Sequence, residues 1–253
     1  MSFKPNDLAA KSTTPATKSE AAHHPEMMPP SFHGNFDLYA MELPFIRSKF
    51  TPEHDYAALL NELRYHQAKP DSSAQIYLPD TDEFSAGVPG RLRSLPVEDP
   101  LEGMPYQLEL TSLALRDSVS FTACETTEDA LYSSAAPVSS ARRTPGMTAT
   151  IVLADDECGV IMTESSFKMR RAWVNPDGKD EVFSVYIACT SACACGILED
   201  DYVDVRLPFW GIRARVGPDG REIGLGTTGE DDENMDMRTL RLSLSRAALN
   251  RDL

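Results

Sequence analysis

Three of the five cysteines are crowded into one short stretch, which is the part of the sequence with the clearest potential for thiol or metal chemistry. Cys189, Cys193 and Cys195 have the spacing C-x3-C-x-C, and Cys124 and Cys158 lie far from them. A structural zinc ion takes four tetrahedral ligands, usually from two paired knuckles, and this spacing does not supply two pairs. We therefore expect no metal and favour structural thiols, with a redox or disulfide role as the alternative.

The histidines offer little for nucleophilic catalysis, because all five lie within the first 66 of the 253 residues. A Ser-His-Asp or Cys-His site would have to recruit His54 or His66, both of which fall in a predicted helix. Their places near the start and the end of that helix explain them structurally, since a helix C-terminus favours a cation. The sequence also lacks Walker A, GxSxG and HExxH motifs, and so we predict no catalytic residues.

Residues 224–229 formally match the GxGxxG dinucleotide-binding pattern. In such a site the pattern opens a helix whose N-terminus holds the pyrophosphate. Here residues 230–233 follow directly, and their consecutive carboxylates would repel phosphates. These acids also lack the ligand order of an EF-hand. We interpret the stretch as an acidic loop and predict no cofactor.

Basic side chains gather where they could meet phosphates or an acidic surface of a partner protein. Arg213 and Arg215 alternate along a predicted strand, which puts both guanidinium groups on one face. The net charge of -15 opposes binding to nucleic acid or anionic lipid unless cations gather locally. Ordinary exposed strand faces are the alternative interpretation. The candidate anion or RNA contacts are Lys168, Arg170, Arg171, Arg213, Arg215, Arg238 and Arg241.

The elements that would position these side chains are mainly β-strands. Beyond Pro145, β-branched and aromatic residues recur in short runs. Residues 175–178 and 217–220 both contain Pro-Asp-Gly and are predicted hairpin turns, because proline presets one φ and glycine accepts a positive one. The pattern predicts a β-rich α+β fold with an antiparallel sandwich or barrel-like body. Strands are predicted at residues 147–153, 159–162, 167–174, 182–189, 202–207, 212–216 and 240–244.

One or two helices accompany the strands. The clearer helix spans residues 51–69, with Thr51 as its N-cap and Pro70 at its end. Tyr56, Leu59, Leu60 and Leu63 recur at helical spacing, and this stripe belongs to the core or to an interface. A short second helix is predicted over residues 128–136.

The N-terminal part of the chain has a different amino-acid composition. Residues 1–33 are mostly Pro, Ala, Ser, Thr and Lys, and they cannot bury enough surface to offset their ordering entropy. An apolar run broken by Pro44 follows. We predict a flexible or extended arm over residues 1–50 and a single β-rich domain over residues 51–253 that starts with the helix. The predicted assembly anchor of the arm is Phe32, Phe36, Leu38, Tyr39, Met41, Leu43, Phe45 and Ile46.

Targeting signals are missing from the sequence. The start has no apolar region of a secretory signal, and no run of about 18 apolar residues occurs. An odd number of cysteines does not resemble the paired framework of a small secreted domain. We expect a cytoplasmic, reducing location with free thiols and no membrane contact.

Pro, Ala and Ser are prominent in AAKSTTPATKSEAAHHPEMMPPS, residues 9–31, and again in residues 133–145. In this composition and in size the chain resembles the proline-alanine-serine-rich proteins of polymycoviruses, which associate with double-stranded RNA genomes. The resemblance implies a non-enzymatic, virion-associated structural or assembly protein that forms a homo-oligomer and coats or contacts RNA. The alternatives are a small enzyme or redox protein that uses the cysteine cluster, and a host-directed binding module.

Overall fold

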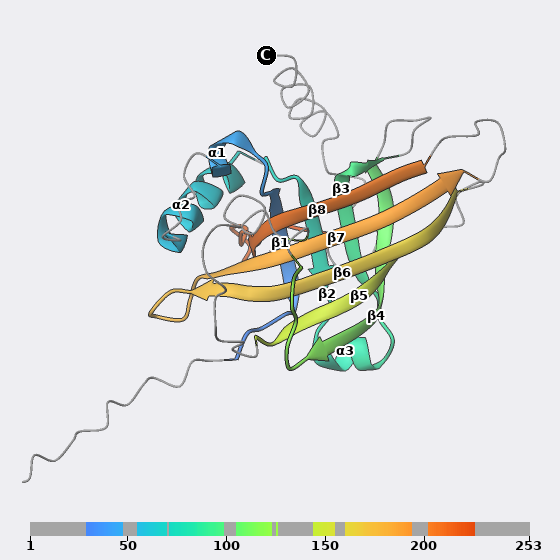
Figure 1. The fold of residues 1–253 in the computed structure, drawn as a ribbon. Helices are drawn as coiled ribbons and strands as arrows, with labels where there is room; N and C mark the ends of the chain where they lie inside the picture. Colours follow the sequence, from blue (N-terminus) through green and yellow to red (C-terminus); the bar gives the residue numbers. More distant parts are fainter. Residues whose placement is uncertain are drawn as a thin grey trace, which may run out of the picture.

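Eight strands form a closed antiparallel barrel in which each strand pairs with the next along the chain and β8 pairs with β1 (Figure 1). The computed structural model describes residues 29–47, 55–69, 71–98, 105–122, 125, 144–154, 160–193 and 202–225. The strands are β1 (Gly34–Ala40), β2 (Ala74–Leu78), β3 (Gly90–Glu98), β4 (Pro105–Arg116), β5 (Gly146–Leu153), β6 (Val160–Val174), β7 (Glu181–Cys193) and β8 (Tyr202–Arg213). The predicted β-rich, barrel-like body is confirmed.

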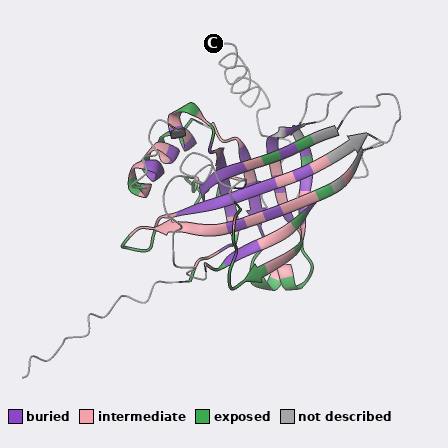
Figure 2. Ribbon diagram, in the orientation of Figure 1, coloured by how far each residue is buried: buried purple, intermediate pink, exposed green. Residues whose placement is uncertain are grey.

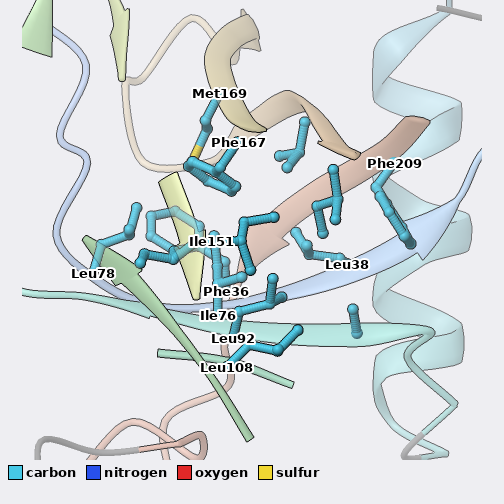
Figure 3. Close-up of a cluster of buried hydrophobic side chains, with 14 of the residues drawn as sticks. Phe36, Leu38, Ile76, Leu78, Leu92, Leu108, Ile151, Phe167, Met169 and Phe209 are labelled. Carbon is cyan, nitrogen blue, oxygen red and sulfur yellow. The ribbon is translucent and has the colours of Figure 1, made fainter. Parts of the chain in front are cut away.

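Apolar side chains fill the barrel. Successive residues of a strand point to opposite faces, so every second side chain enters the interior. Figure 3 shows side chains from β1 to β6 and from β8 that meet there, and Phe183, Val185, Ile187 and Cys189 of β7 belong to the same cluster. The fully buried members include Phe36, Leu38, Ile76, Leu78, Leu110, Ile151, Phe167, Met169 and Phe209. The interior of this barrel is therefore its hydrophobic core.

In the described part of the chain, three helices lie outside the barrel: α1 (Pro44–Arg47), α2 (Tyr56–Gln67) and α3 (Thr81–Ser85). The side chain of Asp55 caps α2 by accepting a hydrogen bond from the backbone N–H of Ala58 (2.9 Å). The inner face of α2 packs on β1, β7 and β8 and forms the outer cluster. Its members are Tyr39, Met41, Ile46, Leu59, Leu60, Leu63, Val182, Trp210 and Ile212.

The predicted helix over residues 51–69 is confirmed in its central part, and its apolar stripe belongs to the core. Residues 51–54 and Pro70 lie outside the described residues. The same holds for the predicted helix at 128–136 and the predicted strand at 240–244.

The strands on one side of the barrel are longer than predicted. Residues predicted as two separate strands are continuous in β6, and β8 likewise runs through Pro208. Proline is tolerated there because its missing N–H does not face β7: the Pro208 carbonyl accepts a hydrogen bond from Met41 on the other side (3.0 Å). Figure 2 shows buried residues along much of β7 and β8, whereas the turn between β6 and β7 is exposed.

Both Pro-Asp-Gly segments form turns. Gly178 and Gly220 have positive φ values of 74° and 81°, and their N–H groups bond to the carbonyls of Asn175 and Gly217 (both 3.0 Å). The first turn joins β6 to β7 as predicted. The second turn does not join two strands, because β8 already ends at Arg213. It is flanked by an isolated bridge between Val216 and Glu222.

β1 is the main departure from the sequence prediction. Gly34–Ala40 pairs with both β2 and β8 and so closes the barrel, whereas the sequence predicts these residues in an arm outside the body. The predicted boundary at residue 50 is therefore too late, and the barrel begins at Gly34. Residues 1–28 of the predicted arm lie outside the described residues.

Candidate functional site

The predicted anchor residues pack against other parts of their own chain. Phe36 and Leu38 lie in the barrel core, and Tyr39, Met41 and Ile46 in the outer cluster. The half-buried Leu43 and Phe45 pack against the same cluster, and Phe32 packs edge-on against Phe183 (ring centroids 6.0 Å apart). The apolar run that suggested a contact with a neighbouring subunit is accounted for within one chain.

Two of the candidate RNA contacts lie on the outer face of β6 and are covered by the segment that precedes β5. Lys168 Nζ lies 2.6 Å from Glu125 Oε1, and the guanidinium of Arg170 lies over the ring of Phe121 (4.6 Å to the centroid). Burial by itself raises the pKa of Glu125, but hydrogen bonds from Lys168 and from the Thr122 N–H and the charge of Lys168 outweigh it and hold that pKa low. Lys168 is therefore neutralised locally.

Two other candidates lie at one end of the barrel interior. Arg171 Nη1 lies 2.9 Å from one carboxylate oxygen of Glu181, and Arg213 Nε lies 3.6 Å from the other. Arg213 also donates two 2.6 Å hydrogen bonds to the carbonyls of Ser31 and His33. We name Arg171, Glu181 and Arg213 the end triad. Through Arg213 it holds the segment before β1, which contains Ser31 and His33, against the barrel. Both arginines are ion-paired with Glu181, so neither is a free cation.

The remaining candidates do not complete a cationic face. Arg215 is exposed just beyond β8, and Arg238 and Arg241 lie outside the described residues. The structure thus divides the five described cations among the outside of β6, the end triad and the turn region. It does not bring them together.

A buried polar network, which sequence reasoning missed, joins α2 to the barrel. Asp37 is only 6% exposed, and its carboxylate accepts hydrogen bonds from Gln67 (2.6 Å) and Gln75 (2.8 Å). Burial raises the pKa of Asp37, while these hydrogen bonds and the charges of Arg64 and Arg215 oppose the rise. In the sequence, the charged residue inside the apolar run of β1 is the feature from which this network could have been predicted. Because both oxygens are bonded, the network positions α2 and offers no free base.

His66 is held between two carboxylates. Its Nδ1 lies 2.9 Å from Asp71 and its Nε2 3.6 Å from Glu62, while its ring stacks on Phe45 at 3.5 Å. Neither ring nitrogen faces a nucleophile among the described residues. The other candidate histidine, His54, lies outside them.

Cys189 is the one cluster thiol whose surroundings are described. It is 2% exposed and lies in the barrel core, where burial and then the charge of Asp204 raise the pKa of the thiol to about 11. The backbone of Cys193 ends β7, and Cys124, Cys158 and Cys195 lie outside the described residues. Within the described ranges no group of three or more metal-ligating side chains occurs.

We expect Cys189 to resist alkylation in the native protein. With a pKa of about 11, only about one thiol in a thousand is a thiolate at pH 8, and the thiolate is the reactive form. Iodoacetamide labelling at pH 8 followed by peptide mapping should leave Cys189 unmodified until urea unfolds the chain. Rapid labelling of Cys189 without urea would contradict its burial and its raised pKa.

A small hollow lies on the outer side of β3 and β4. It has a volume of about 40 Å³ and is lined by residues that include Arg91, Arg93, Gln107 and Leu225. A hollow needs about 10 to 15 Å³ of such volume to hold one water molecule, so this one has room for a few waters. The hollow does not fit an organic substrate.

The edge of β8 is the candidate interaction site. β1 pairs with residues 209–213 of β8, whereas β7 pairs with residues 202–211. Beyond β1, the N–H of Met41 makes one further bond to Pro208, and the chain then turns away into α1. Residues 202–207 therefore pair with a strand on one side only within the described part of the chain. We name these residues the β8 edge (Figure 1).

Comparisons with protein-family models, with curated proteins and with solved structures found no match. Among the helices that the structure describes, none is both long and apolar enough to span a membrane.

Proposed function

We propose that this chain is a non-catalytic structural protein that self-associates, with its barrel as the packed building block. The β8 edge carries the proposal. A strand that pairs on one side only presents N–H and C=O groups that can bond to a strand of another molecule. Such an edge is a ready surface for association, and the rigid barrel behind it holds the edge in a fixed shape.

The barrel interior supports a structural role over that of a ligand carrier. Barrels that carry a small molecule keep room for it inside the wall. Here side chains from opposite walls, among them Phe36, Ile151 and Phe167, meet in the interior (Figure 3). The end triad and Phe32 add packing where the N-terminal segment enters.

The groups that could do chemistry support the non-catalytic assignment. The Cys189 thiol is buried with a raised pKa, and both nitrogens of His66 face carboxylates. Asp37 has both carboxylate oxygens hydrogen-bonded. Each is better explained by packing than by turnover of a substrate.

The surface that we assign to association differs from the predicted arm, whose apolar side chains pack within their own chain. RNA association and a viral setting stay predictions from composition. They receive no added support from Lys168, Arg171 and Arg213, which are ion-paired within the chain.

Light scattering coupled to size-exclusion chromatography tests the proposal. One chain has a mass of 27.9 kDa, and at tens of micromolar the purified protein should elute with at least twice that mass. The mass should fall on dilution, because mass action governs a reversible association. A constant monomer mass over the whole concentration range would refute self-association.

A further inference from the structure

We propose that the β8 edge pairs with the β8 edge of a second copy, antiparallel and about a two-fold axis at Val205. The inference rests on the proposed self-association and names its surface, partner and register. It follows from the direction of the backbone groups along β8 and from the order of charges on the exposed face.

The backbone groups that face the open side of β8 belong to the even-numbered residues. Ala214 donates its N–H to Asn35 (2.9 Å), and Pro208 accepts from Met41 (3.0 Å), so both residues face β1. The direction of N–H and C=O alternates along a strand, and the pairing of β8 with β7 shows no register shift from Tyr202 onward. The N–H and C=O groups of Asp204 and Arg206 therefore point to the side where β1 is missing.

On this open side of β8, no neighbouring strand of the described residues forms a hydrogen-bond ladder with residues 202–207. Within the described residues, β3 comes near β8 but forms no ladder with it, since β3 pairs only with β2 and β4. Val205 faces the barrel core and is 8% exposed. A second strand can therefore bond to the edge without drawing Val205 out of the core.

Charge selects one register. Asp204 and Arg206 lie on the same outer face, where Arg206 Nε pairs with Asp204 Oδ1 of its own chain at 3.0 Å, and 51% and 53% of their side-chain areas stay accessible to a second copy. A two-fold axis at Asp204 or at Arg206 would place like charges directly opposite, which destabilises a strand pair. An axis at Val205 instead places Asp204 opposite Arg206 of the second copy, and it does so twice by symmetry.

The same register satisfies the backbone. In an antiparallel ladder, residues with groups facing the partner exchange two hydrogen bonds per pair, and Asp204 with the second copy's Arg206 forms such a pair. Pro208 falls opposite Tyr202 and lacks an N–H, which ends the ladder on each side. The pairing is thus short and self-complementary, as expected for a C2 contact.

Charge reversal at these two positions provides the test. Asp204→Arg places arginines opposite arginines, and Arg206→Asp places aspartates opposite aspartates. Each single variant should weaken self-association about tenfold or more, measured by sedimentation equilibrium. The double variant D204R/R206D restores opposite charges across the axis and should restore association. Arg221→Asp, an exposed charge change at the other end of the barrel, is the matched control.

The outcomes separate this inference from the proposed function. If the wild-type chain associates and both single variants associate equally well, the β8 register is wrong while self-association stands. Weakening by both single variants without rescue by the double variant would also overturn the register. A wild-type chain that stays monomeric refutes the proposed function itself. Circular dichroism melting of each variant confirms that the barrel is folded before association is measured.

Discussion

A chain that lacks residues 1–46 is expected not to fold, whereas a chain that lacks residues 1–28 is expected to keep the barrel. The first deletion removes β1, which pairs with both β2 and β8. The barrel then loses its closure, and two strand edges that were paired become open. The second deletion ends before Pro29 and leaves every described contact of the barrel in place.

The size of the effect follows from the side chains that β1 and the segment after it bury. Those with at most 2% exposure are Phe36, Leu38, Tyr39, Met41 and Ile46. Burial of one such side chain stabilises a protein by about 1.5 to 3 kcal/mol. Five of them together match or exceed the total stability of a typical domain, which is about 5 to 15 kcal/mol.

Circular dichroism and urea unfolding of the two truncated chains provide the measurement. The chain without residues 1–28 should unfold cooperatively near the midpoint of the full-length protein. The chain without residues 1–46 should be insoluble or show no cooperative transition. Cooperative unfolding of that shorter chain would mean that β1 is dispensable, and the barrel closure described above would then be incorrect.

The contrast between β1 and the later strands shows what the sequence can and cannot reveal. Most later strands have turn residues at their ends, and the Pro-Asp-Gly turn between β6 and β7 was predictable from local chemistry. β1 is buried on both faces, by the core on one side and by α2 on the other, so even its polar residues Asn35 and Asp37 are buried instead of facing solvent. Preceded by a Pro-rich leader, it resembles an anchor segment more than a barrel strand.

The candidate site was less predictable, because it depends on the ends of strands that are distant in sequence. The β8 edge exists only because β1 stops at Ala40 while β8 begins at Tyr202. Likewise, the sequence predicts Arg171 and Arg213 as exposed cations. In the structure their side chains lie on the strand faces that point toward Glu181. Non-local register decides both features, and a single sequence does not contain it.

The end triad leads to the second large expected effect. Glu181→Gln removes the only carboxylate of the triad and leaves the guanidinium groups of Arg171 and Arg213 facing a neutral amide. The side chains of Arg171 and Glu181 are 9% and 10% exposed. Removal of one partner of a buried ion pair costs about 3 to 5 kcal/mol, because the remaining charge stays buried and uncompensated. Arg213 is 24% exposed and keeps its bonds to Ser31 and His33, which favours the lower end of this range.

Urea unfolding should therefore show a lower midpoint for Glu181→Gln with an unchanged m value, since the surface exposed on unfolding stays the same. Glu164→Gln is the matched control: its side chain is 79% exposed beside Arg206, and it should change stability by less than about 1 kcal/mol. The double variant Arg171→Met with Glu181→Leu removes both charges of the more buried pair and leaves the more exposed Arg213 with its bonds to Ser31 and His33, so it should be more stable than Glu181→Gln. If Glu181→Gln unfolds at the wild-type midpoint, the end triad contributes no net stability, and packing around Phe32 and Phe36 alone holds this end of the barrel.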